Sequence, residues 1–283
     1  MAQASCPEGK VLGWDQATCC WPGQNVGPFG CTGPPTSCPV GLVITGEGCD
    51  RPDSAAAARN AYNPALLDPS KATETAPDEF TVRFKTTQGD ILIDVTRAWA
   101  PNGADRFYNL VRIGFYNQVA FFRVVSGFMA QVGIHGDPKV SAVWRESVIQ
   151  DDPVVESNLP GYVTYAMAGP NTRTTQLFFN FADNHRLDRD GFSPFGRVRD
   201  MAVLENLYDG YGEGAPRGRG PNQLYIQDRG NSYLKTEFPD LDWILEATIE
   251  PAAKPAAADP APADPAPAQA APAKTPEATP AGD

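Results

Sequence analysis

The chain has 283 residues, of which 42% are hydrophobic and 20% are charged, and its formal net charge is −11 at pH 7. This acidic balance excludes general nucleic-acid binding, which needs a basic face that displaces counterions from phosphates. No run approaches about eighteen consecutive apolar residues, so the sequence predicts no transmembrane helix. Only two histidines occur, His135 and His185, which leaves little material for a metal site or a Ser/Cys-His catalytic pair, and we expect no metal and no cofactor.

All six cysteines lie in a loop-rich stretch at the start of the chain: Cys6, Cys19, Cys20, Cys31, Cys38 and Cys49. An even number of cysteines in a short segment rich in Gly and Pro predicts a small disulfide-stapled module, here over residues 1–50. Zinc is the alternative. No Cys-x-x-Cys pair occurs, however, and the adjacent Cys19-Cys20 suits a tetrahedral site poorly, so the sequence favours disulfides.

Disulfides indicate an oxidising compartment. The opening Met1–Ser5 is too short for the apolar part of a signal peptide, although Ala2-x-Ala4 resembles the end of a cleavage site. We therefore expect an exported bacterial protein, periplasmic or at the cell surface, whose signal peptide is absent from this chain. A cytosolic protein with reduced cysteines and a lipid anchor on Cys6 are the alternatives. A count of free thiols under native conditions tests the disulfides.

Two segments with little material for a core flank a central domain. Residues 51–78 are rich in Ala, Pro, Asp and Thr and predict a linker, in which Leu66 and Leu67 could dock on the following domain. Residues 251–283 are Ala/Pro repeats with too few large apolar residues to repay ordering, which predicts a disordered tail. The domain between them covers residues 79–250.

Regular structure is predicted from Phe80 onward. Alternating apolar residues on both sides of Gln88-Gly89-Asp90 predict a β-hairpin. After Pro101 the apolar residues recur at helical spacing, and Gly114 lies where a helix can end in a left-handed residue. Further strands are expected at 161–168, 175–181, 195–199 and 241–250, and a second helix after Asp200 that buries Val203, Leu204 and Leu207. Many short strands with two helices favour a mainly β fold, a closed antiparallel barrel.

The segment from Tyr208 to Pro221 is rich in glycine. Its spacing fits neither the dinucleotide-binding nor the P-loop pattern, and no strand-to-helix junction surrounds it. We expect a surface loop, in which Arg217 and Arg219 could widen a substrate surface.

The stretch from Phe121 to Gly133 contains a single cation, Arg123, inside a β-branched and aromatic run typical of a buried strand. A guanidinium is permanently charged, so it is tolerated there only if it is paired or faces a wet groove. A core strand whose arginine pairs with a buried carboxylate is one interpretation. A pocket that combines this donor with apolar groups and an amide is the other.

A second stretch, Tyr165 to Phe181, has a Gly-Pro-Asn turn and then Gln176 and Phe178 on one face of a strand. Together the two stretches resemble the cyclophilin family of peptidyl-prolyl isomerases, and the resemblance covers Phe80 to Glu250. It implies an eight-stranded closed barrel with a helix at each end, an enzyme that isomerises X-Pro bonds, and proline-containing polypeptides as partners. We expect a monomer.

The resemblance also implies roles for individual residues. Arg123 would be the catalytic donor and Gln131 would hold it and the substrate backbone. The apolar proline pocket and its surroundings would consist of Phe128, Met129, Phe178 and Leu187, with Ala166, Met167 and Gln176 along the neighbouring groove and Phe192 at the rim.

This chain departs from the family pattern at three positions. Phe122 replaces a frequent His and should point away from Arg123, Phe192 replaces a rim His, and Arg186 replaces a Trp of many eukaryotic members. Because cyclosporin uses that indole as a hydrogen-bond donor, weak cyclosporin binding is expected. Two other function classes stay open: a proline-peptide binding module without turnover, and a structural protein with an inert barrel.

Overall fold

The computed structural model describes residues 63–251 without a gap and, before them, residues 6, 10–12, 19–27, 30–33, 35–39, 42–44 and 48–50. The predicted tail beyond Pro251 lies outside the described residues, as does the predicted linker from 51 to 62. None of the helices in the described part of the chain combines the length and the apolar character needed to cross a bilayer.

The N-terminal segment is held by three disulfides, Cys6–Cys19, Cys20–Cys31 and Cys38–Cys49. All six cysteines of the sequence are therefore paired, and the prediction of disulfides rather than zinc is confirmed. Three two-stranded antiparallel sheets accompany the bridges: β1 (Val11–Leu12) with β2 (Cys19–Cys20), β3 (Asn25–Gly27) with β4 (Gly30–Thr32), and β5 (Val43–Ile44) with β6 (Cys49–Asp50).

The end of the predicted linker is folded onto the domain that follows. It forms two 3₁₀ turns, η1 (Pro64–Leu67) and η2 (Pro69–Lys71). Leu66 is buried and its carbonyl accepts a hydrogen bond from Trp144 Nε1 at 2.9 Å, whereas Leu67 remains 43% exposed. Docking is therefore confirmed for Leu66 and wrong for Leu67, because one turn presents only one of two adjacent side chains to the core.

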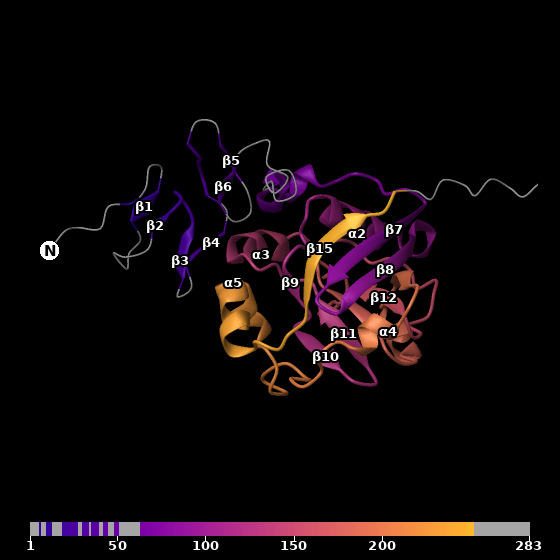
Figure 1. Ribbon diagram of the computed structural model, residues 1–283. Helices are drawn as coiled ribbons and strands as arrows, with labels where there is room; N and C mark the ends of the chain where they lie inside the picture. The colour runs from indigo at the N-terminus through magenta and orange to yellow at the C-terminus, as the bar shows by residue number, and fades with distance from the viewer. Residues whose placement is uncertain are drawn as a thin grey trace, which may run out of the picture. The chain divides into compact units, whose positions relative to one another are not determined.

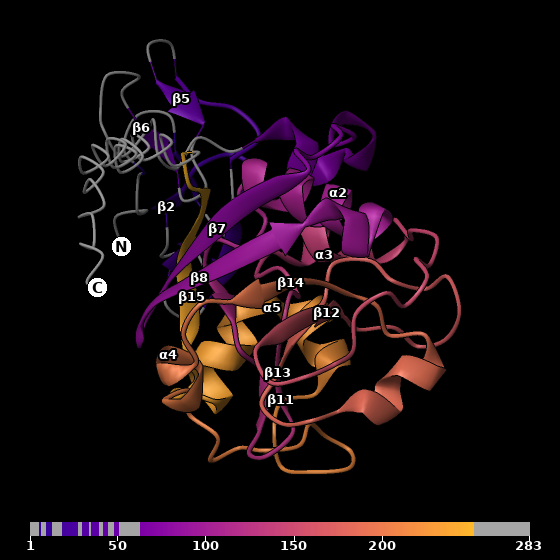
Figure 2. The same cartoon turned by 90° about the vertical axis from the view of Figure 1, so that its right-hand side faces the viewer.

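The predicted hairpin consists of β7 (Glu79–Thr86) and β8 (Gly89–Thr96). Thr86 lies opposite Gly89, so the turn is Thr87-Gln88, slightly earlier than expected. The apolar residues that alternate with polar ones in the sequence are the buried ones, since every second side chain of β8 from Ile91 onward lies in the core. The hairpin lies beside β15 in Figure 1 and leads into the rest of the sheet in Figure 2.

The remaining strands of this sheet are β9 (Val119–Ala120), β10 (Arg123–Val125), β11 (Met129–Val132), β12 (Tyr162–Tyr165), β13 (Leu177–Asn180), β14 (Pro194–Val198) and β15 (Trp243–Ile249). They follow the order β10-β11-β13-β12-β14-β8-β7-β15-β9, with antiparallel pairs throughout. The two edge strands, β9 and β10, are consecutive in the chain with only two residues between them. The sheet therefore curls until its edges meet in one interrupted strand, which makes the nine segments an eight-stranded closed barrel.

Helices cover the openings of this curled sheet. The predicted first helix is α2 (Pro101–Arg112), which buries Phe107 and Leu110 in the main core and is followed by Gly114 at φ +77°. The predicted second helix is a single turn, α4 (Ala202–Glu205), although Leu204 and Leu207 are buried as expected. The structure adds α3 (Pro138–Arg145), η3 (Arg97–Trp99) and η4 (His185–Asp190), none of which was predicted.

A longer helix, α5 (Gln223–Glu237), was also missed by the sequence reading. It begins after Asn222, whose side chain accepts a hydrogen bond from Leu224 N. Ile226, Tyr233 and Leu234 form a second apolar cluster with Ala120, Phe122, Ile134 and Leu241, separate from the main core. This helix therefore packs on the outer side of the interrupted strand that carries Arg123.

Candidate functional site

The site residues are arranged by strand register. In β10 and β11, Arg123 lies opposite Gln131, and in β11 and β13, Gln131 lies opposite Phe178. Directly opposed residues of antiparallel strands point to the same face, so a cation, an amide and an aromatic ring form one row across three strands. Met129 is two residues from Gln131 and shares its face. Sheet pairing thus brings together residues 55 positions apart in sequence, as the resemblance implied.

Arg123 is the only cation of this row, and its side chain is 21% exposed. Its Nη1 donates to Gln131 Oε1 at 2.9 Å, and Gln131 Nε2 donates in turn to Gln176 Oε1 at 2.8 Å. The expected hold of Gln131 on Arg123 is therefore present, and Gln176 extends the chain of amides. Arg123 Nε is buried and has no hydrogen-bond partner in the described part of the chain. The fold itself thus leaves this donor unsatisfied, which costs free energy.

Apolar groups surround the guanidinium. Met129 and Phe178 are buried, with 2% and 5% of their surface exposed, and the ring of Phe192 meets that of Phe178 edge-on at 5.7 Å. The guanidinium carbon of Arg123 lies 5.8 Å from the centroid of the Phe128 ring, within the range of a cation–π contact. The site thus combines a charged donor with an apolar wall, which suits a ring such as that of proline next to a polar amide.

The other three predicted site residues, Ala166, Met167 and Leu187, lie outside the strands that form this row. Ala166 N donates to Gln176 O at 2.9 Å, which fixes Ala166 beside the amide chain. The methyl carbon of Met167 is 3.6 Å from the position that a Cβ would take on Gly191. Leu187 lies in η4, and its carbonyl accepts a hydrogen bond from Phe192 N at 3.2 Å. The contacts of the described residues therefore link Met167 and Leu187 to the loop that carries Phe192.

Two of the departures from the family pattern can be placed. Phe122 is 1% exposed and belongs to the α5 cluster, so it points away from Arg123, as expected. Arg186 is exposed, and its guanidinium lies 5.0 Å from the centroid of Phe128, on the ring that Arg123 also contacts. The expected weakness of cyclosporin binding stays a prediction.

Sequence reasoning missed Glu213, which lies in the glycine-rich segment 208–221. Its Oε2 accepts a hydrogen bond from Arg123 Nη2 at 2.6 Å, and the Glu213 side chain is 38% exposed. The hydrogen bond and charge of Arg123 outweigh the effect of partial burial, so the pKa of Glu213 is lowered and the carboxylate is ionised at neutral pH. The segment is thus part of the site and more than the surface loop we expected. No pattern in the sequence relates Glu213 to a residue 90 positions earlier.

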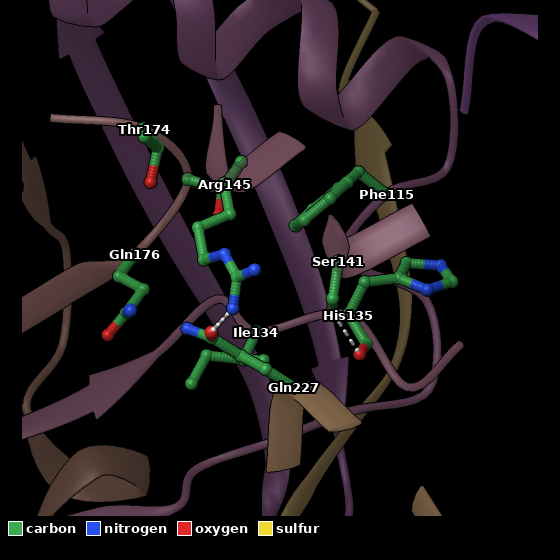
Figure 3. Close-up of a pocket in the computed structure, with 9 residues that line it drawn as sticks. Phe115, Ile134, His135, Ser141, Arg145, Thr174, Gln176 and Gln227 are labelled. Atoms are coloured by element: carbon green, nitrogen blue, oxygen red, sulfur yellow. Dashed lines mark hydrogen bonds between the residues drawn. The ribbon is translucent and has the colours of Figure 1, made fainter. Parts of the chain in front are cut away.

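A small cavity of about 40 Å³ adjoins the site and shares Gln176 with it (Figure 3). Its other side chains come partly from α3 and α5, where Arg145 Nη1 donates to Gln227 Oε1 at 2.7 Å. His135 also lines it and accepts a hydrogen bond from Asp137 N at its Nδ1. Burial lowers the pKa of His135 to about 4, so the imidazole is neutral at pH 7 and acts as an acceptor within the fold.

Comparison with known proteins agrees with this geometry. The family model described as cyclophilin type peptidyl-prolyl cis-trans isomerase/CLD matches residues 81–223. A peptidyl-prolyl cis-trans isomerase-like 3 protein of Rhizopus delemar is 33% identical over 131 residues, which are 43% of this chain and 76% of that protein. A peptidyl-prolyl cis-trans isomerase of Helicobacter pylori is 27% identical over 152 residues, which are 51% of this chain and 93% of that protein. Among solved structures, a cyclophilin type isomerase of Cryptosporidium parvum aligns at 20% identity and a TM-score of 0.47, covering 62% of this chain and 99% of that one.

Proposed function

Since the chain belongs to the cyclophilin-type peptidyl-prolyl cis-trans isomerase family, we propose that Arg123 is the residue that catalyses its reaction. The family and its activity, isomerisation of X-Pro bonds, are given by the comparisons. The assignment of Arg123 is ours. It is supported by one observation above all: a partly exposed arginine in a row with Gln131 and Phe178, which supplies a fixed donor beside an apolar wall.

The reaction needs no nucleophile and no general base. Amide resonance gives the X-Pro bond a rotation barrier of roughly 18–20 kcal/mol, and unaided isomerisation takes tens to hundreds of seconds. When the bond twists, resonance is lost and the proline nitrogen becomes pyramidal, so its lone pair becomes a better hydrogen-bond acceptor. A donor aimed at that nitrogen or at the prolyl carbonyl binds the twisted state better than either planar isomer, which is the condition for catalysis.

In this proposal, some residues of the site bind the proline ring and others hold the donor. The proline ring lies against Met129, Phe178 and Phe192, which excludes water from one side of the bond. Gln131 keeps Arg123 in place through Nη1, whose other contact is a weak one with Met129 Sδ at 3.9 Å, so the terminal nitrogens keep donor capacity toward a substrate. A guanidinium without a competing water shell acts more strongly on the developing lone pair than it would in bulk solvent.

The test of Arg123 is an isomerisation assay on an Ala-Pro or Gly-Pro peptide, by protease coupling or NMR exchange. Arg123→Ala should lower kcat/KM by roughly 100-fold, the loss typical of removing one transition-state donor, while the peptide Kd changes little. Arg197→Ala, which removes an exposed arginine of β14, is the matched control and should keep full activity. If Arg123→Ala retains the rate of the intact protein, Arg123 is not the catalytic donor.

We further propose that the physiological substrates are exported polypeptides. The support is the N-terminal segment, whose three disulfides suit an oxidising compartment better than a reducing one. Fractionation of the source cells tests this proposal directly. Recovery of the protein in the reducing cytosolic fraction, with free thiols, would contradict it.

A further inference from the structure

In the contact between Glu213 and Arg123, each of the two side chains makes a further hydrogen bond that fixes it. Glu213 Oε2 accepts from Arg123 Nη2 at 2.6 Å, and the other carboxylate oxygen accepts from Gly214 N at 2.9 Å. At the opposite end of the guanidinium, Nη1 is held by Gln131. Arg123 is therefore fixed at two nitrogens by residues from two different parts of the chain.

The glycine-rich segment is folded around the backbone of Glu213. Gly220 N donates to Glu213 O at 2.8 Å, and a Cβ on Gly218 would collide with that same carbonyl oxygen. A Cβ on Gly220 would lie only 2.9 Å from it. Because glycine alone lets the chain pass so close, two of the five glycines of the segment are explained by the position of the Glu213 backbone.

The segment is also anchored to the rest of the domain. Tyr208 N donates to Asp242 Oδ2 at 2.7 Å, and Tyr211 Oη donates to Asp240 Oδ2 at 3.1 Å. The Tyr211 ring meets that of Phe238, just after α5, edge-on at 5.0 Å. These contacts fix the segment before Glu213, so the carboxylate does not have to be ordered separately at the site.

Fixing an arginine matters for catalysis because its side chain is long and has many rotamers. Each such side chain that a complex must immobilise costs free energy, and a donor that is already in place avoids that cost. Partial burial of the pair, with 21% and 38% of the two side chains exposed, weakens the competition from water. Nη2 keeps a second hydrogen, and the other hydrogen of Nη1 makes only a weak contact with Met129 Sδ at 3.9 Å, so donors remain available.

We propose that Glu213 is a positioning residue of the isomerase, which holds the Arg123 guanidinium in its catalytic orientation through Nη2. This inference rests on the proposed role of Arg123. It assigns to the glycine-rich segment a function in the known reaction, that of carrying a carboxylate to the catalytic donor.

The test compares Glu213→Ala, Glu213→Asp and Glu213→Gln with the intact chain in the peptide assay. Glu213→Ala should lower kcat/KM about tenfold, the cost of one freed side chain, with the peptide Kd unchanged within about twofold. Glu213→Asp should resemble Glu213→Ala, because the shorter side chain withdraws the carboxylate while keeping its charge. Glu213→Gln should retain most of the activity, since its amide oxygen can still accept from Nη2. Asp209→Asn removes one charge from the same segment at an exposed side chain and should have no effect.

A double-mutant cycle separates positioning from other roles. In an Arg123→Ala background, Glu213→Ala should cause no further loss, because the residue that it positions is gone. An equal loss in both backgrounds, or an unchanged rate for Glu213→Ala, overturns the inference. A faster Glu213→Ala overturns it too and would mean that the contact withholds a donor from the substrate. If Arg123→Ala itself is fully active, the failure lies in the proposed function. Thermal melting of each variant shows whether the fold is intact, and Glu213→Asp carries the comparison if Glu213→Ala melts early.

Discussion

At the scale of a residue, the burial of two arginines distinguishes an ion pair that serves the fold from one that serves the site. Arg173 is 1% exposed and donates from both terminal nitrogens to Asp152 Oδ2, at 3.0 and 3.1 Å. That carboxylate is itself 3% exposed, so the pair is enclosed and its charges serve the fold. Arg123 has a partner as well, but the pair with Glu213 is partly open to solvent, since 38% of the Glu213 side chain is exposed. The sequence alternative of a core arginine paired with a buried carboxylate thus describes Arg173 better than Arg123.

His135 leads to a prediction about stability and pH. Its pKa is lowered by burial from 6.5 to about 4, so between these values the unfolded chain binds a proton that the folded chain does not. Stability should therefore fall as the pH drops from about 6.5 to 4, and this contribution should level off below 4. Because His135 as a whole residue is only partly buried, we expect a contribution of roughly 2 kcal/mol, less than the full shift would give.

The measurement is urea unfolding at several pH values for the intact chain, His135→Asn and His185→Asn. His135→Asn should be destabilised at pH 7 by lost packing, yet should lose less stability than the intact chain between pH 6.5 and 4. His185 is 70% exposed in its side chain, so its variant serves as the control and should follow the intact chain. Identical pH slopes for all three proteins would show that His135 does not titrate as described.

At the scale of elements, the sequence predicted the strands and much of the site, and the reasons are local. The strands alternate in burial, and the residues on both sides of Gly127 lie on one hairpin whose register aligns Arg123 with Gln131. Helix α5 did carry a signal, since Ile226, Tyr233 and Leu234 recur at helical spacing after the N-cap Asn222. Gly230 interrupts that pattern, and a glycine is unfavourable in the interior of a helix. The contact of Glu213 had no local signal, because it depends on how a loop folds back across the barrel.

Substitution of Gly230 tests how far the kink in α5 depends on glycine. Gly230 has φ +62° and ψ −151°, a conformation essentially limited to glycine, and a Cβ there would collide with the carbonyl oxygen of Gly136. Gly127 also has a positive φ, +69°, but no atom lies within 4 Å of its Cβ position. Gly230→Ala should therefore lower the free energy of unfolding by roughly 3 kcal/mol or more, and Gly127→Ala by only about 1 kcal/mol. Equal losses in urea unfolding would mean that crowding at Gly136 contributes nothing.

At the scale of the whole molecule, covalent and non-covalent stabilisation are divided along the chain. Every cysteine lies at or before Cys49, and all are in disulfides within that segment. The main core, in contrast, is a continuous apolar cluster that runs from Ala65 to Ala247 and contains no cysteine. A short segment with little apolar material depends on its bridges, whereas a closed barrel of this size buries enough surface to be stable without them.

Reduction should therefore separate the two parts functionally. Treatment with a thiol reductant should raise the number of titratable thiols from zero to six, while kcat/KM on an X-Pro peptide stays within about twofold, because neither Arg123 nor the row of residues beside it depends on a disulfide. Alkylating the reduced protein and removing the reductant controls for effects on the assay, and a thermal melt followed by circular dichroism controls for loss of the barrel fold. Loss of activity on reduction, with the barrel still folded, would show that the disulfide-bonded segment contributes to the isomerase site, a dependence that the contacts within the barrel do not require.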